Sequence, residues 1–164
     1  ALSRETVSRS LEPWTSLLST PPPASSKQDD LFAVRREMAT LMTNQVGVFR
    51  TGVELEDAVE KLRQLKERYE SISPRGGIQP FNYALMDYLE VGHLLELSTL
   101  IARGALARTE SRGAHFRVDY PRRDDENWLC NIVVQKTKSG MKLTKVPIVT
   151  SELSPEQIKK MLKK

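Results

Sequence analysis

Three long segments of this sequence repeat apolar residues every three or four positions, and this spacing constrains the fold more than any other feature. The first segment begins at Asp29 or Asp30 and ends at about Val46, the second covers about 53–70 and the third about 79–109. Such spacing gathers apolar side chains on one face of an α-helix, and that face has to be buried against a partner. Consecutive helices with short connections pack antiparallel. The sequence therefore predicts a mainly α fold built on an up-down three-helix bundle.

The inward face of each predicted helix follows from the same spacing. We expect the core to contain Leu31, Val34, Met38, Leu41, Met42 and either Gln45 or Val46 from the first segment, Leu55, Ala58, Val59, Leu62, Leu65 and Tyr69 from the second, and Phe81, Leu85, Tyr88, Val91, Leu95, Ser98, Ile101, Ala105 and Thr109 from the third. Gly92 and Gly104 interrupt the third segment and permit close packing or a bend there.

Capping signals indicate where these helices begin and end. Thr51 and Glu54 have the spacing of a capping box. The stretch SPRGG at 73–77 ends the second helical pattern, because its glycines suit a turn with positive φ. Upstream, TPPPASSK at 20–27 interrupts regular structure, since proline lacks an N–H donor and holds the backbone extended. We therefore expect residues 1–28 to form an extension with one or two helical turns and a proline-rich linker.

The pattern changes to alternation after about residue 129. β-Branched and polar residues alternate on both sides of KSG, which predicts a short β-hairpin with strands at about 130–136 and 141–146. Ser154, Pro155 and Gln157 are the capping residues of a short C-terminal helical turn. The expected domains are the extension (1–28), the three-helix bundle with an ESRGAH motif (29–128), and the hairpin with a basic tail (129–164).

The stretch TESRGAHFRVDYPRRDDENWL at 109–129 lies between the bundle and the hairpin. It contains four arginines, five acidic residues and no lysine. Arginine forms planar, bidentate pairs with carboxylates and suits partly buried contacts better than lysine does. The stretch therefore predicts a fixed ionic network. Two locations remain open at this point: the network closes the end of the bundle within the chain, or it lies at an interface with another domain or subunit.

Motifs that identify an active site are absent from the sequence. It contains no GxGxxG, no Walker loop, no CxxC pair, no HExxH and no GxSxG. His93 and His115 have no cysteine or aspartate cluster beside them, so no metal site is expected and His93 is assigned a structural role. Cys130, the single cysteine, and the tryptophans Trp14 and Trp128 are expected to pack against other residues. We predict no catalytic, cofactor-binding or metal-binding residue in this chain.

The charge of the chain leaves a different kind of function open. The net charge is +4, and eight lysines fall between Lys136 and Lys164. A phosphate-binding surface would use such charge, but the same region has neither the aromatic residues nor the arginines that read bases. We expect a solvated tail and no nucleic acid partner. No apolar run reaches the ~18–20 residues of a spanning helix, so direct membrane insertion is not expected.

Three stretches resemble one protein family. ALARTESRGAHFRVDYPRRDDENWL is similar to the motif that closes the C-terminal helical domain of the fumarate reductase and succinate dehydrogenase flavoprotein subunits. Residues 34–69 (VRREMATLMTNQVGVFRTGVELEDAVEKLRQLKERY) resemble the family's turn between its first two helices, and 94–108 (LLELSTLIARGALAR) resembles its third helix. The resemblance covers about 30–150. Val118 and the pair Cys130-Asn131 depart from the family's usual residues.

The resemblance implies the C-terminal domain of a FAD-dependent enzyme that interconverts succinate and fumarate and transfers electrons to an iron-sulfur subunit. In that family the residues that bind flavin and substrate precede this domain, so FAD belongs to the parent protein and no cofactor belongs to this chain. The start at Ala1, without a methionine, fits a missing upstream part. The implied partners are the flavin-binding domain of the same protein and the iron-sulfur subunit, and the implied location is cytoplasmic, peripheral to the inner membrane through partner subunits. The residues that the resemblance marks as a signature and contact surface are Glu110, Ser111, Arg112, Gly113, Ala114, His115, Arg117, Asp119, Arg123, Asp124 and Asp125.

Two alternatives accompany this interpretation. The C-terminal domain of L-aspartate oxidase shares the ESRG core and a similar bundle, but that family usually departs after the histidine and lacks the RDDENWL extension. A basic helical adaptor that binds protein or nucleic acid is the second alternative, because the tail is rich in lysine. Salt-dependent binding would favour the adaptor.

Overall fold

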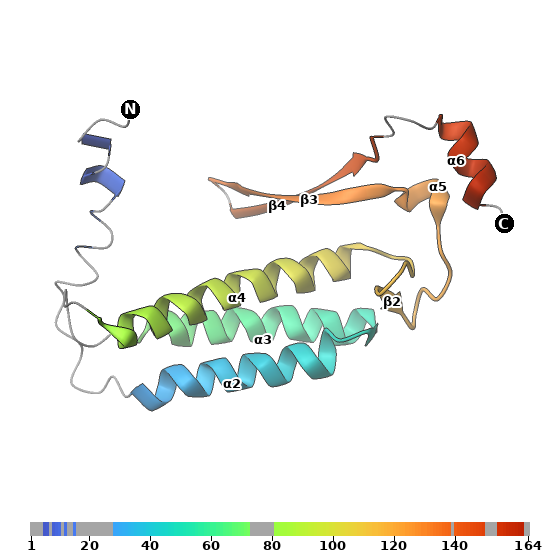
Figure 1. The fold of residues 1–164 in the computed structure, drawn as a ribbon. Coiled ribbons are helices and arrows are strands. Elements are labelled where there is room, and N and C mark those ends of the chain that lie inside the picture. The colour runs from blue at the N-terminus through green and yellow to red at the C-terminus, as the bar shows by residue number, and fades with distance from the viewer. Residues whose placement is uncertain are drawn as a thin grey trace.

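The computed structural model describes residues 28–72, 81–138, 140–149 and 154–162, together with seven scattered residues between 5 and 15. Three helices, α2 (Gln28–Gln45), α3 (Gly52–Glu70) and α4 (Tyr83–Ala107), lie side by side (Figure 1). A hairpin of β3 (Cys130–Thr137) and β4 (Gly140–Pro147) extends back along α4, on the side away from α2 and α3 (Figure 1). The prediction of a helical bundle followed by a short hairpin is confirmed.

The core lies between the three helices, and its residues follow the predicted faces. The buried apolar side chains are Leu31, Val34, Met38, Leu41, Val46, Leu55, Ala58, Leu62, Leu65, Tyr88, Val91, Leu95, Ala102 and Ala105. Three predicted inward positions are wrong: Phe81 is 85% exposed, Ile101 is 53% exposed, and Thr109 is also exposed. Phe81 precedes the helix. On α4 the core face passes from Ser98 to Ala102, four residues later, since a helix has 3.6 residues per turn.

The predicted caps of α3 and of the C-terminal helix α6 (Pro155–Leu162) are confirmed. Thr51 Oγ1 accepts from the Glu54 backbone N–H at 3.2 Å, and Glu54 Oε2 accepts from the Thr51 backbone N–H at 3.1 Å. Ser154 and Gln157 repeat this reciprocal arrangement at 3.2 and 2.7 Å. Each pair satisfies backbone N–H groups that have no partner inside the first helical turn.

Helix α4 is shorter than the predicted segment 79–109. It begins at Tyr83, because the Asn82 side chain caps it by accepting from the Leu85 backbone N–H at 3.0 Å. It ends at Ala107, and Thr109 is exposed beyond that end. The turn at 73–77, the linker at 20–27 and Trp14 lie outside the described residues. The described residues between 5 and 15 are helical, as expected.

Three short elements were not predicted. Strands β1 (Phe49–Arg50) and β2 (Phe116–Arg117) pair in parallel, with Phe49 opposite Phe116, and α5 (Asp125–Trp128) is a single helical turn. Two-residue strands are too short to show alternation, and their pairing joins segments that lie far apart in the sequence. This pairing holds the connection between α2 and α3 against the segment that follows α4.

One face of the hairpin covers α4. Ile132 and Val134 of β3 and Met141 and Leu143 of β4 are half-buried, whereas their neighbours along each strand are exposed. The strands pair from Cys130 opposite Pro147 to Thr137 opposite Gly140. An isolated two-stranded hairpin is marginally stable, so contact with α4 is expected to stabilise it.

None of the helices within the described part of the chain is both long enough and apolar enough to cross a membrane.

Gly92 of α4 leaves the space that one aromatic stack requires. The rings of Tyr69 on α3 and Tyr88 on α4 stack with centroids 4.4 Å apart. A Cβ at position 92 would lie 2.4 Å from Tyr69 Oη and 2.8 Å from Tyr69 Cζ. Gly92→Ala is therefore expected to lower the free energy of unfolding by ~1–3 kcal/mol, since overpacking outweighs the gain in helix propensity. Urea denaturation followed by circular dichroism measures the change.

Gly104 of the same helix provides the matched control. No atom lies within 4 Å of a Cβ built at this position. Gly104→Ala is expected to raise the free energy of unfolding by up to ~1 kcal/mol, because alanine has the higher helix propensity. If both variants were stabilised alike, the proposed conflict with Tyr69 would be wrong.

Candidate functional site

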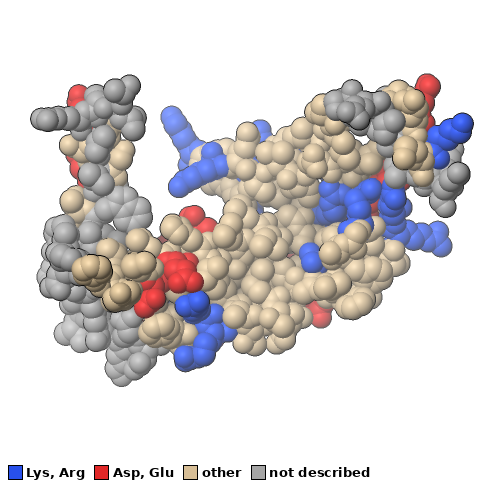
Figure 2. Space-filling model, viewed as in Figure 1, with Lys and Arg blue, Asp and Glu red and all other residues tan. Residues whose placement is uncertain are grey.

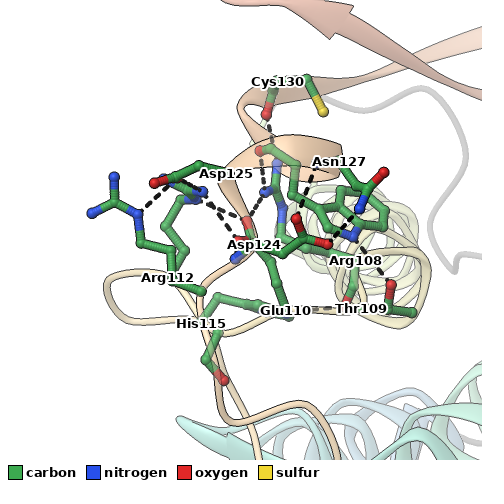
Figure 3. A network of polar contacts seen from close by, with 12 residues as sticks. Arg108, Thr109, Glu110, Arg112, His115, Asp124, Asp125, Asn127 and Cys130 are labelled. Atoms are coloured by element: carbon green, nitrogen blue, oxygen red, sulfur yellow. Dashed lines mark hydrogen bonds and ion pairs between the residues drawn. The ribbon is translucent and has the colours of Figure 1, made fainter. Parts of the chain in front are cut away.

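Glu110 lies at the centre of the ionic stretch, directly after the end of α4 (Figure 3). Its side chain is fully buried. The carboxylate accepts from Arg108 Nη1, from Arg112 Nε at 2.8 Å and Nη2 at 3.1 Å, and from the Asp124 backbone N–H at 2.8 Å. Burial by itself raises the pKa of Glu110, but the hydrogen bonds from Arg112, Asp124 and Arg108 outweigh it, so the pKa lies below its ordinary value. Glu110 is therefore held as a buried, paired carboxylate.

The network extends outward from Glu110 to the surface. Arg112 also donates to Asp125 Oδ1 at 2.6 Å, and Arg123 Nε donates to the same oxygen at 2.8 Å. The side chain of Arg112 is 29% exposed, and that of Arg123 is 41% exposed. Cations and anions therefore alternate from the buried Glu110 to the surface, and Asp125 and Arg123 at the outer end are partly exposed to solvent.

Arg108 connects the end of α4 to the hairpin. It donates to the backbone oxygens of Trp128 at 3.1 Å and of Cys130 at 2.6 Å, and its guanidinium lies 5.1 Å from the centre of the Trp128 ring. Lys145 Nζ of β4 lies 3.3 Å from the centre of the same ring. Cations over a tryptophan face are attracted by its quadrupole. Trp128 is buried, as predicted, and anchors α5 and the hairpin to the bundle.

Helix α5 is capped by its own sequence. Asp124 Oδ1 accepts from the Asn127 backbone N–H at 3.0 Å, and Oδ2 accepts from Asn127 Nδ2 at 2.9 Å. Aspartate is one of the residues preferred at the N-cap of a helix, so Asp124 was the available sequence signal for the start of this turn. It places the Asp124 backbone N–H against Glu110.

A second ionic pair joins the ends of two helices. Arg117 is 2% exposed, and its Nη1 donates to the backbone oxygens of Ala105, Leu106 and Arg108, each at 3.2 Å, at the C-terminal end of α4. Its other two nitrogens donate to both oxygens of Asp119 at 2.8 and 2.6 Å. A cation at a helix C-terminus is stabilised by the helix dipole.

Asp119 completes this connection at the start of α3. Its Oδ2 accepts from the Gly52 backbone N–H at 3.0 Å, so the carboxylate lies at a helix N-terminus, where the dipole favours an anion. The hydrogen bonds from Arg117 lower the pKa of Asp119 to about 2, against a smaller opposing effect of burial. The pair therefore links α3 and α4 through charges that complement both helix ends.

A tight turn at Gly113 reverses the chain between these networks. The backbone N–H of Arg112 donates to the His115 oxygen at 2.8 Å, and that of His115 donates to the Arg112 oxygen at 3.0 Å. Gly113 has φ +57°, and a Cβ there would meet no atom within 4 Å. Glycine is thus favoured by the left-handed backbone and not by lack of room. Ser111 Oγ accepts from the Arg117 backbone N–H at 2.9 Å and holds β2 beside the turn.

His115 is fixed as a neutral imidazole by its neighbours. Its Nδ1 lies 3.2 Å from Arg50 Nη1, and its Nε2 lies 3.4 Å from the Arg108 backbone oxygen. Arginine only donates and a carbonyl only accepts, so Nδ1 accepts and Nε2 carries the proton. Burial, followed by the charges of Arg50 and the other nearby arginines, lowers the pKa of His115.

The structure brings all the predicted signature residues together at one end of the bundle, and the ion pairs close within the chain. These pairs match the first of the two locations that the sequence left open, and an interface with another domain or subunit stays a prediction. Arg50 and Lys145 also belong to the arrangement, and no sequence pattern pointed to either, because both come from other segments. Cys130 is half-buried, in agreement with the expected packing role, whereas His93 is exposed on α4. The described residues include no group of side chains that would hold a metal ion.

A surface groove between α2 and α3, with a volume of about 700 Å³, is not a suitable flavin site. Glu37 and Arg68 in its lining pair with each other at 2.5 Å. Its lining comes from the sides of two helices and includes neither a glycine-rich turn nor a helix N-terminus. Those are the features that usually hold a dinucleotide phosphate.

The fold and the ionic end define a class of protein: a three-helix domain whose end carries a closed network of arginines and carboxylates. Residues 35–160 match the family described as fumarate reductase flavoprotein C-term. The chain belongs to this family.

Individual relatives agree with this membership. The chain is 35% identical over 134 residues to the fumarate reductase flavoprotein subunit of Helicobacter pylori. The aligned residues make up 79% of this chain and 19% of the relative. It is 41% identical over 100 residues to the succinate dehydrogenase flavoprotein subunit of Coxiella burnetii, covering 61% of this chain and 17% of the relative. An E. coli quinol fumarate reductase structure superposes with a TM-score of 0.80 at 28% identity, over 92% of this chain and 26% of the solved chain.

This chain thus spans about a fifth of the length of the relatives that it matches. The relatives named above are fumarate reductases and a succinate dehydrogenase, so the L-aspartate oxidase alternative is not favoured.

Removing the Glu110 carboxylate is expected to destabilise the chain strongly. Glu110→Ala leaves the cations of Arg108 and Arg112 and one backbone N–H without their acceptor, and breaking a buried pair in this way costs ~3–5 kcal/mol. Urea denaturation of the variant measures the loss. Glu60→Ala is the control, since it removes an exposed ion pair with Arg63 and should change stability little. Equal effects of the two substitutions would contradict the central role of Glu110.

His115 is expected to make stability depend on pH. Its pKa in the fold is lowered from 6.5, so protonation favours the unfolded state. The contribution of His115 is complete above about pH 6.5 and is lost as the pH falls below that value. The melting temperature should therefore fall between pH 7.5 and 5.5, and His115→Gln should reduce this dependence. His93→Gln, at the exposed histidine of α4, is the control and should retain it.

Proposed function

We propose that this chain is a structural and interface domain of a FAD-dependent flavoprotein that interconverts succinate and fumarate and transfers electrons to an iron-sulfur subunit. The observation that carries the proposal is the family match over 35–160, whose centre is the closed ionic network around Glu110. The catalytic residues and FAD are assigned to the upstream part of the parent protein, and none to this chain. The relatives are several times longer than this chain, which leaves room for such a part.

The signature residues are proposed to act through the shape of the surface that they hold. Glu110, Arg117 and Asp119 fix the chain at the end of the bundle, while Arg112 and Arg123 remain partly exposed. Charges that are already oriented need little reorganisation when they meet a partner of complementary charge, and they also favour a single orientation. The proposed partner of this end is the flavin-binding domain of the same protein.

The remaining partners follow from the family. The matched E. coli structure is a quinol fumarate reductase. We propose that the parent protein likewise joins an iron-sulfur subunit and is located on the cytoplasmic side of the inner membrane, bound to it through partner subunits. The basic-adaptor alternative has less support, because Lys145 packs against Trp128 and the region from Lys136 to Lys164 has neither arginine nor aromatic residues.

Purifying the natural polypeptide that carries this sequence tests the proposal. We expect a chain several times larger than 18.6 kDa that shows flavin absorbance and releases FAD on denaturation. It should oxidise succinate with an artificial electron acceptor and leave L-aspartate unchanged. A colourless natural polypeptide of 18.6 kDa would contradict the proposal, and oxidation of L-aspartate in place of succinate would favour the alternative family.

A further inference from the structure

Strand β3 has one edge that β4 does not cover. In an antiparallel pair, every second residue turns its backbone N–H and C=O away from the partner strand. Cys130 belongs to this outward set, because Pro147 opposite it has no N–H to donate and the Cys130 oxygen accepts from Arg108 Nη2 at 2.6 Å. Alternation along the strand assigns three further residues to the outward set, and their backbone groups form the free edge of β3: Ile132, Val134 and Lys136.

The free edge pairs with no other strand in the described part of the chain. Strands β1 and β2 pair with each other, and no backbone group of another described segment bonds to Ile132, Val134 or Lys136. Backbone N–H and C=O groups are strong hydrogen-bonding groups, so an uncovered strand edge is a template on which another extended segment pairs.

The two edges of the hairpin differ in sequence. Proteins usually block an uncovered strand edge with lysine or proline. Strand β4 carries both kinds of residue, at Lys142, Lys145 and Pro147. Residues 130–135 of β3 carry neither charge nor proline, and their isoleucine and two valines favour extended structure. This contrast is expected if the edge of β3, and not that of β4, has a partner.

A groove of about 380 Å³ runs along the free edge. Val134 and Gln135 both line it, and successive residues of a strand face opposite sides of a sheet, so the groove follows the edge of β3 and not one face of the hairpin. Lys66 of α3 and Leu100 of α4 line its other sides. A second hollow of about 520 Å³ adjoins it through shared lining residues: Lys66, Glu96 and Lys136. Figure 2 shows the hairpin standing clear of the helices near its tip, with a hollow beneath it.

We propose that one extended peptide segment of a partner protein adds to the free edge of β3 as a third strand. An extended backbone repeats a donor and an acceptor at every second residue, about 7 Å apart, and this is the spacing that the free edge offers. Helix α3 forms the far side of the groove, so the groove holds a few residues of a single segment and not the sheet of a second folded domain. The proposal concerns the hairpin alone and does not depend on the flavin chemistry of the parent protein.

The lining of the groove specifies the side chains of this segment. Leu100, Val134 and Met141 are half-buried and make part of the lining apolar. Two lysines, Lys66 and Lys136, lie in the lining against one acid, Glu96, so the groove has an excess of positive charge. The segment that fits is therefore one in which apolar residues alternate with polar ones and at least one residue is acidic.

Hydrogen–deuterium exchange of the full-length protein, purified in the natural complex that contains it, tests the proposal at single amides. We expect the amides of Ile132 and Val134 to exchange at least about tenfold more slowly than those of Met141 and Leu143, because a third strand would bond the first pair only. Met141 and Leu143 provide the outward amides of β4, and all four residues are half-buried, so burial does not separate the two edges. Equal exchange rates on the two edges would overturn the proposal.

Separating the full-length polypeptide from its partners identifies the source of the strand. We expect the protection of the free edge to disappear in the separated polypeptide, since a partner protein supplies the segment. Protection that remains after separation would mean that the strand comes from the same polypeptide or from a second copy of it, and would overturn the assignment to a partner.

Two proline substitutions provide a matched comparison. Val134 and Leu143 lie opposite each other in the hairpin. Proline at either position removes an outward N–H that the pairing of β3 with β4 does not use. In the complex, Val134→Pro should return the amides of Ile132 and Lys136 to the exchange rates of the separated polypeptide, whereas Leu143→Pro should leave them protected. Continued protection in the Val134 variant would overturn the proposal.

Discussion

The hydrogen bonds to the buried carboxylate of Glu110 hold together the end of the bundle at which α4 meets the hairpin. Two arginines and one backbone N–H converge on it, and each belongs to a different part of the connection between α4 and the hairpin. A buried ion is tolerated only when its partners satisfy it, so this carboxylate specifies one arrangement of the chain around it. The hairpin would otherwise be joined to the bundle mainly through its half-buried face on α4.

The Arg117–Asp119 pair has a related effect within the bundle. It links the C-terminal end of α4 to the N-terminal end of α3, and the sign of each charge matches the helix dipole that it meets. Together with β1 and β2, it gathers three segments of the chain at one end. These contacts fix the positions of the charged side chains relative to the ends of α3 and α4.

Local patterns accounted for much of the fold. The capping box of Thr51 and Glu54 and the apolar spacing of α2 and α3 depend on neighbours within a few residues, so they could be predicted correctly. Ile101 was misplaced because α4 has apolar residues on several sides, and periodicity then does not single out one face. Arg50 could not be assigned to the site, because its contact with His115 depends on a parallel pairing of two distant, two-residue strands.

Residue patterns were sufficient to predict three amphipathic helices, a hairpin and an arginine–carboxylate network between them, and the ESRGAH stretch carried the resemblance to one flavoprotein family. Which charges pair, that these pairs close within the chain, and which side of α4 stays exposed became visible only in the folded chain. The difference arises from how far apart along the chain the contacting residues lie. Helix and strand patterns arise from contacts between near neighbours, whereas the pairing of Arg50 with His115 and of Lys145 with Trp128 exists only after distant segments have packed together.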